Sequence, residues 1–166
     1  MIKLEKKDSI YFLKMDAGEN RWNTTFVREI AKALDKIDDD EGQGALITSS
    51  TNSKFFSNGL DLDWMQAPED HPDGGDREVF GKEFMYLMGR FITLPIPTIC
   101  ALNGHTFGAG FMFALSHDFR IMREDRGFLC ANEMQLGLPI PRPELALFKH
   151  KISANAFFET VQLSKR

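Results

Sequence analysis

Two apolar strands that each lead into a glycine-broken loop constrain the fold of this chain most. Ala45-Leu46-Ile47-Thr48 precedes the loop from Phe55 to Leu62, and Thr98-Ile99-Cys100-Ala101-Leu102 precedes the loop from Asn103 to Gly110. Short apolar runs between turn signals are typical of buried parallel strands. Helical periodicity follows each loop, and this repeated order favours parallel strands joined by right-handed crossovers. We therefore expect an α/β fold.

The other segments fit the same organisation. Residues 2–6 and 10–15 predict a β-hairpin, and Thr24 is the predicted N-cap of an amphipathic helix that ends near Asp38. The stretch from Ala67 to Asp76 lacks apolar periodicity and predicts a mobile surface loop that can act as a lid. The remaining predicted elements are helices 77–92, 109–116, 144–151 and 154–163 and strands 119–123 and 128–131.

Composition narrows the class of protein. With 166 residues, 43% of them apolar, residues 1–166 suffice for a single domain. The net charge is −4 and the basic residues are scattered, which argues against a nucleic-acid partner, and no apolar run is long enough for a membrane span. Cys100 and Cys130 lie in apolar runs without metal-ligand spacing and predict reduced core thiols.

The termini show no recognisable targeting signal. The first eight residues are charged and lack the apolar segment of a secretory signal, so an intracellular protein is expected. The last three residues, Ser164-Lys165-Arg166, differ in their final position from the Ser-Lys-Leu peroxisomal address. We interpret that near match as chance.

The two loops suggest a pair of backbone donors. Gly59 and Gly108 allow turns that point the N–H groups of Leu60 and Ala109 out of the chain, and Ala109 also begins a predicted helix. Two such amides can hold a developing oxyanion, and Glu133 downstream is a carboxylate that can move a proton. Either loop alone is more often an ordinary turn. Together with Glu133 they predict enolate chemistry on an acyl thioester.

Ordered motifs along nearly the whole chain resemble the crotonase family, also called the enoyl-CoA hydratase and isomerase superfamily. They are Asn20-Arg21-Trp22-Asn23, F-x-N-G-x-D-L at 56–62, P-x-P-T-I-x-A-x-x-G at 95–104, S-H-D at 116–118 and D-R-G-F at 125–128. The resemblance implies repeated ββα turns that form two near-perpendicular sheets. It also implies a homotrimer and an acyl-CoA substrate whose thioester oxygen lies between the Leu60 and Ala109 amides. Coenzyme A is then part of the substrate, and no metal or separate cofactor is expected.

A second motif narrows the implied activity. Asn132-Glu133-Met134-Gln135-Leu136-Gly137 resembles the N-E-x-x-L-G motif of Δ3,Δ2-enoyl-CoA isomerases, most closely the plant peroxisomal type, and so implies a peroxisomal or cytoplasmic isomerase with Glu133 as its single proton shuttle. Hydratases of the family carry another glutamate where this chain has Met112. The loop 54–62 is implied to cradle the adenine. The expected substrate-binding residues are Lys54, Phe56, Ser57, Asn58, Gly59, Asp61, Leu62, Trp64, Phe107, Gly108, Met112 and Asn132.

Several roles stay open at this level. Asn132 either assists the reaction or caps a turn. His105 is more readily a structural histidine than a residue that contacts the ligand. Asp61 and Asp63 indicate a turn rather than a metal site. Family members usually continue well past Arg166, which predicts missing C-terminal helices, exposed apolar surface and weak activity. A non-catalytic acyl-CoA-binding protein is therefore one alternative. A hydratase or thioester hydrolase is the other, and Met112 argues against it.

Overall fold

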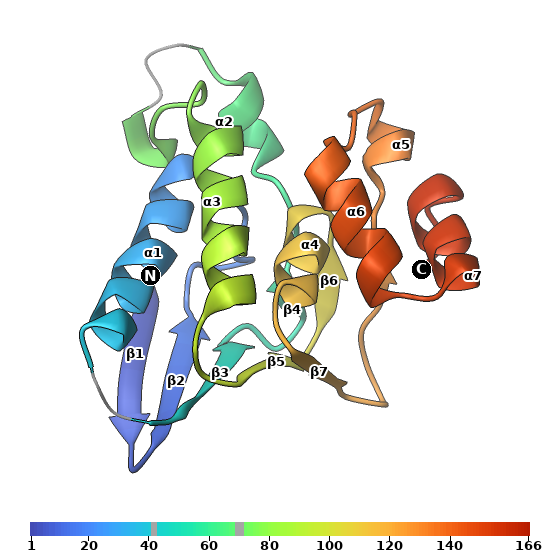
Figure 1. Ribbon diagram of the computed structural model, residues 1–166. Coiled ribbons are helices and arrows are strands. Elements are labelled where there is room, and N and C mark those ends of the chain that lie inside the picture. Colours follow the sequence, from blue (N-terminus) through green and yellow to red (C-terminus); the bar gives the residue numbers. More distant parts are fainter. Residues whose placement is uncertain (41–42, 69–71) are drawn as a thin grey trace.

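The chain opens with a hairpin because two alternating segments flank a tight turn. Figure 1 shows the computed structural model, which describes residues 1–40, 43–68 and 72–166. In it β1 (Ile2–Lys7) pairs antiparallel with β2 (Ile10–Met15). Asp8 at the turn has a φ of 54°, a left-handed conformation that aspartate tolerates better than most residues. The predicted hairpin is confirmed.

Three further turns of the chain each add one strand to each of two sheets. The first strands are β3 (Ala45–Ser50), β5 (Thr98–Leu102) and β7 (Phe119–Met122), and they extend the hairpin into a sheet of order β1-β2-β3-β5-β7. The second strands are β4 (Phe55–Ser57), β6 (His105–Phe107) and β8 (Leu129–Cys130), in that order. Neighbouring strands in both sets pair in parallel. The expected α/β fold with repeated ββα turns is confirmed.

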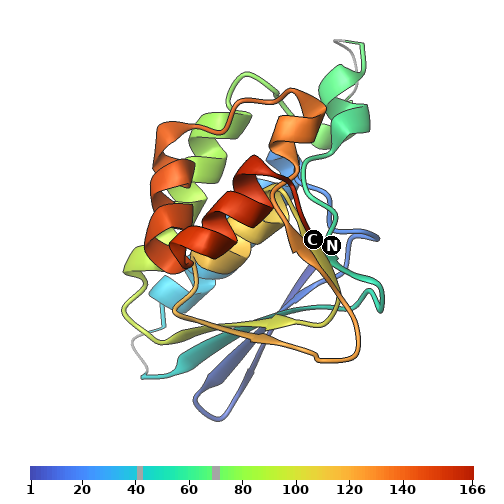
Figure 2. The same cartoon turned by 90° about the vertical axis from the view of Figure 1, so that its right-hand side faces the viewer.

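The longer helices lie over one face of the larger sheet (Figures 1 and 2). They include α1 (Thr24–Asp38), α3 (Phe80–Thr93) and α4 (Ala109–Leu115). Burial alternates along the strands beneath them: in β5, Cys100 is buried whereas Ile99 is half-buried. The predicted parallel strand is confirmed, but its side chains are fully buried only at alternate positions, because helices cover one face of the sheet. On the uncovered face of β7, Phe119 is 60% exposed and Ile121 65%.

The core between these helices is built around Trp22. Its ring packs edge-on against Phe26, Phe84 and Phe113, with centroids 4.9–5.0 Å apart. Its indole N–H donates to Ser57 Oγ at 3.0 Å, so the polar end of this buried side chain is satisfied. Trp22 thus fixes the first loop against three helices.

Helix starts depend on which side chain reaches the free amides. Asn23, rather than the predicted Thr24, caps α1 by accepting from the Phe26 N–H at 2.8 Å, whereas the Thr24 hydroxyl donates to the Asp76 carbonyl oxygen. Helix α3 begins at Phe80, three residues later than predicted. The Asp76 side chain accepts a hydrogen bond from the Glu78 N–H, and this bond holds the residues just before α3 in a turn.

The described part of the predicted lid segment is held in place. Residues 72–74 form a 3₁₀ turn, and the Trp64 indole donates to the Gly75 carbonyl at 3.0 Å. The lid prediction also covers residues 69–71, which lie outside the described residues.

The chain after β8 forms three more helices. They are α5 (Glu133–Leu136), α6 (Arg142–Lys151) and α7 (Ala154–Phe157), and α2 (Leu62–Gln66) is a similar short helix after β4. Of these, α6 packs against α4. The predicted helix 154–163 is not regular, because a π-helical turn, Phe158–Gln162, follows α7 and the Leu163 N–H donates to the Phe158 carbonyl. In the described part of the chain, no helix has the length and apolar character needed to cross a bilayer.

Candidate active site

The first loop presents the Leu60 amide. The backbone N–H of Trp22 donates to the Gly59 carbonyl at 2.8 Å, and the Asp61 N–H donates to the Trp22 carbonyl at 2.9 Å. Leu60 therefore pairs with Trp22 as a short parallel bridge. Successive amides of an extended segment point to opposite sides, which turns the Leu60 N–H away from Trp22. Within the described residues, no acceptor pairs with the Leu60 N–H.

The second loop presents the Ala109 amide in a similar way. Gly108 has a φ of 49° and a ψ of −122°, a conformation that residues with a Cβ rarely adopt, and its own N–H donates to the Cys130 carbonyl at 2.9 Å. The next residue, Ala109, is the first of α4 and its N–H has no acceptor within that helix. Nor does any other described residue accept from it.

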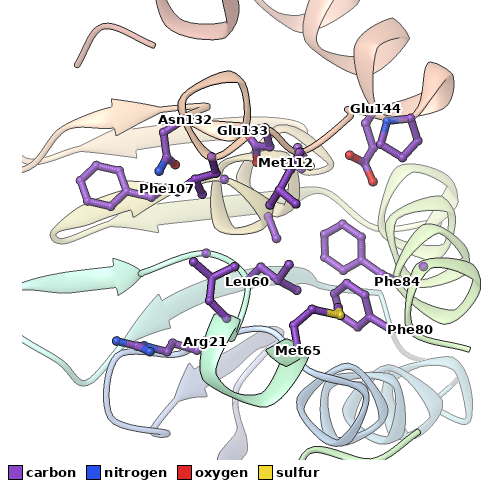
Figure 3. Close-up of a pocket in the computed structure, with 18 of the residues that line it drawn as sticks. Arg21, Leu60, Met65, Phe80, Phe84, Phe107, Met112, Asn132, Glu133 and Glu144 are labelled. Atoms are coloured by element: carbon purple, nitrogen blue, oxygen red, sulfur yellow. The ribbon is translucent and has the colours of Figure 1, made fainter. Parts of the chain in front are cut away.

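The two loops are in direct contact. A Cβ added to Gly59 would lie 3.0 Å from the Phe107 carbonyl oxygen and 3.8 Å from the Gly108 Cα. Leu60 and Ala109 both line one pocket of about 420 Å³, shown in Figure 3. The structure thus brings together the two segments that the sequence singled out.

Glu133 enters the same pocket from the third turn. It begins α5 directly after β8, which pairs with β6, and a Cβ added to Gly108 would lie 2.8 Å from its Oε1. Its Oε2 is buried and has no hydrogen-bond partner among the described residues. Burial raises the pKa of Glu133 above its ordinary value. A raised pKa makes the carboxylate a stronger proton acceptor.

The pocket wall is mainly apolar, and it includes several residues that the sequence did not indicate. Phe107 and Met112 contribute to it as expected. The unexpected apolar side chains are Met65, Phe80, Phe84, Leu136, Leu138, Pro139 and Pro141. An apolar wall of this kind suits a hydrocarbon chain and excludes water from the carboxylate.

Trp64, a predicted substrate-binding residue, is not part of that wall, and neither is Phe111. Trp64 is buried behind it, edge-on to Phe80 with centroids 5.5 Å apart. Phe111 faces Phe148 in the core at 5.2 Å.

Four more of the predicted substrate-binding residues lie outside the pocket. Ser57 and Phe56 are fully buried: the Ser57 hydroxyl donates to the Asn20 carbonyl, and Phe56 stacks on Phe113. Asp61 caps α2 through the Trp64 N–H, in agreement with the turn interpretation. The Lys54 ammonium lies 4.9 Å from the Phe55 ring centroid. A role of the 54–62 loop in holding adenine stays a prediction.

The other predicted residues line the pocket together with Gly59 and Gly108. They are Asn58, whose amide donates to Glu19 at 2.8 Å, Leu62 and Asn132. The Asn132 side chain makes no capping hydrogen bond to α5, so a cap is not its role in this structure. His105 is stacked between Phe107 and Phe128, and its buried Nδ1 has no partner among the described residues.

The sequence did not predict a place in the pocket for two charged residues, Arg21 and Glu144. Arg21 lies at the edge beside Leu60 and pairs with Glu19 at 2.9 Å and Asp63 at 2.8 Å. Glu144 on α6 is 8% exposed, and burial, followed by the nearby Glu133 carboxylate, raises its pKa to about 7. No local pattern marks Glu144, because its position depends on how α6 packs across the pocket.

Comparisons with known proteins agree with this geometry. Residues 5–165 match the family model described as enoyl-CoA hydratase/isomerase. Two relatives in Arabidopsis thaliana, the peroxisomal enoyl-CoA delta isomerases 2 and 1, are 35% and 37% identical over 99% of this chain. The chain spans 69% and 67% of their lengths.

A solved structure shares the fold. A probable enoyl-CoA hydratase from Mycobacterium tuberculosis superposes with a TM-score of 0.86 and 26% identity, over 99% of this chain and 67% of that one. The resemblance seen in the sequence motifs is therefore confirmed: the chain belongs to the enoyl-CoA hydratase/isomerase family.

Proposed function

We propose that this protein binds a 3-enoyl-CoA and moves its double bond to the 2-position. One observation carries the proposal: the Leu60 and Ala109 amides and the buried Glu133 carboxylate oxygen line one apolar pocket, and none of the three has a hydrogen-bond partner among the described residues. The names of the Arabidopsis relatives support the same activity. Acyl-CoA as the substrate, a peroxisomal location and a homotrimer are parts of this proposal.

The proposed reaction needs a base and a place for negative charge. The Glu133 carboxylate takes a proton from C2, and the electron pair moves into the thioester carbonyl to form an enolate. The Leu60 and Ala109 amides donate to that oxygen, where one such donor contributes about 2.7–4 kcal/mol to transition-state stability. The protonated Glu133 then returns the proton at C4. The carboxylate is regenerated, and the product is the conjugated 2-enoyl thioester.

Hydration of a 2-enoyl-CoA is the second candidate, because Glu144 gives the pocket another carboxyl group. However, buried Met112 lines this pocket at the position where hydratases of the family carry their other glutamate. An apolar side chain there neither orients nor activates a water molecule. We therefore place isomerisation first.

The test is an assay of the purified chain with a 3-enoyl-CoA that follows the conjugated 2-enoyl thioester. Glu133→Gln should lose about 10²–10⁴-fold in turnover, or more, and still bind acyl-CoA. Glu124→Gln, at an exposed glutamate outside the pocket, is the matched control and should keep the wild-type rate. An unchanged isomerase rate in Glu133→Gln rules out the proposed base, and efficient release of 3-hydroxyacyl-CoA by the wild type favours hydration.

A further inference from the structure

Glu144 is an unusual residue for the end of the pocket in which it lies. Figure 3 shows its carboxylate pointing into the pocket beside Phe84 and Phe80, on the side away from Phe107 and Asn132. The neighbouring wall is apolar, yet no hydrogen bond or ion pair to the Glu144 carboxyl is found within the described residues. Glu144 is also 8% exposed, so its side chain contacts little solvent.

A buried carboxyl without a partner is costly. Leaving such a group unpaired destabilises the folded protein, and more so when the group is ionised. The cationic residue of this pocket, Arg21, lies at the opposite edge in Figure 3 and is already paired with Glu19 and Asp63. Within the described part of the chain, the protein therefore offers Glu144 no compensation. A ligand can supply the missing partner.

The position of Glu144 indicates which part of a ligand it faces. The Leu60 and Ala109 amides and Glu133 define where a thioester would react. In Figure 3, Glu144 lies to the right of Leu60 and Glu133, beside Phe84. An acyl chain that runs from the amides along Phe84 passes Glu144 with atoms remote from the reacting carbons. A plain hydrocarbon would leave the carboxyl unpaired, whereas an oxygen-bearing chain would pair with it.

We propose that Glu144 determines specificity by hydrogen-bonding an uncharged oxygen-bearing group, a hydroxyl or a carbonyl, in the distal part of the acyl chain. The preferred substrates are then oxygenated acyl thioesters, not unsubstituted ones. This inference rests on the proposed function in one respect: the ligand in the pocket is an acyl-CoA. Near neutral pH the neutral form of Glu144 offers both a donor and an acceptor, which suits either group.

The test uses binding of saturated acyl-CoA thioesters, which cannot isomerise. Pairs of equal chain length, with and without a hydroxyl placed at successive carbons from C5 outward, are titrated calorimetrically into the purified chain. At the matching position the wild type should bind the hydroxylated ligand about 10–100-fold more tightly. Glu144→Leu should abolish that preference and bind the plain ligand more tightly than the wild type does. Glu144→Gln should retain part of the preference, and Glu124→Gln all of it.

Other outcomes overturn the inference. Equal affinity for both ligands at every position in the wild type contradicts it, and so does a preference that survives in Glu144→Leu. If Glu144 instead moved protons or activated water, Glu144→Gln would lower turnover of plain and hydroxylated substrates equally, without changing relative affinity. A wild type that binds neither ligand refutes acyl-CoA as the occupant. A wild type that discriminates but does not isomerise leaves Glu144 as the specificity residue and rejects only the proposed reaction.

Discussion

Replacing Gly108 by alanine tests whether the Glu133 carboxylate acts where the structure places it. The added methyl group would lie 2.8 Å from Glu133 Oε1, closer than a Cβ approaches other atoms in real structures. Ordinary contact begins near 3.4 Å, so the carboxylate oxygen must move by about 0.6 Å. The flexible end of a glutamate can make that movement, and the fold should survive.

Two separate effects are expected from Gly108→Ala. The φ of 49° with a ψ of −122° strains a residue that has a Cβ, at about 1–3 kcal/mol of unfolding free energy. Displacement of the base lowers turnover, and a shift of about 1 Å in a catalytic group can cost 10²-fold. We expect a loss of about 10–100-fold in the isomerase rate.

Gly18→Ala is the matched control. Gly18 has a φ of 60° and nothing within 4 Å of an added Cβ, so the substitution introduces backbone strain without touching the pocket. Urea denaturation measures the free energy of unfolding of both variants, and the 3-enoyl-CoA assay measures their rates. Gly18→Ala should lose stability and keep its rate. Full activity in a folded Gly108→Ala would show that the carboxylate position seen here is not the one that matters for turnover.

Three further predictions address the second amide, the buried carboxyl and a helix cap. Ala109→Pro removes the N–H at the first residue of α4, a position where proline is tolerated, and should lower kcat about 10²–10³-fold. Ala109→Gly keeps the N–H and should stay close to the wild-type rate. An active Ala109→Pro would exclude this amide from the oxyanion site. Because burial raises the pKa of Glu144 from about 4.5 to about 7, the folded state keeps a proton that the unfolded chain releases, so unfolding free energy should fall by up to about 3 kcal/mol as the pH rises through that range. Glu144→Gln should remove that loss, and identical urea midpoints for both proteins at pH 5 and pH 8 would contradict it. Asn23→Ala removes the α1 cap and should cost about 1 kcal/mol in the same assay, whereas an unchanged midpoint would mean that the cap contributes nothing.

The sequence predicted the parts of the site that depend on local chemistry. Glycines after strands required special turns, and the turns at Gly59 and Gly108 do have positive φ values. The order of strands then predicted parallel pairing. Glu133 was identified through its motif, and its position in the pocket follows from the pairing of β8 with β6.

What the sequence could not predict depends on packing between distant elements. Glu144 belongs to a segment without a distinctive motif, and only the packing of α6 beside the pocket makes it a buried acid. Trp64 shows the converse: an aromatic residue next to the first loop suggested a pocket wall, but its indole N–H donates to the Gly75 carbonyl and its ring packs edge-on against Phe80. The N-cap of α1 was predicted one residue too late, at Thr24 instead of Asn23, because asparagine and threonine are both good N-caps.

The small sheet explains why three unrelated segments converge. Its strands run in parallel in the order β4-β6-β8, so the residues that follow each strand emerge at the same edge. The first strand leads to the Leu60 amide, the central strand to the Ala109 amide, and the last to Glu133. Gly108 therefore has a neighbour on each side, Gly59 in one loop and Glu133 in the other, and both contacts are seen. Each ββα turn supplies one chemical group, and the parallel pairing of the small sheet sets the spacing among them.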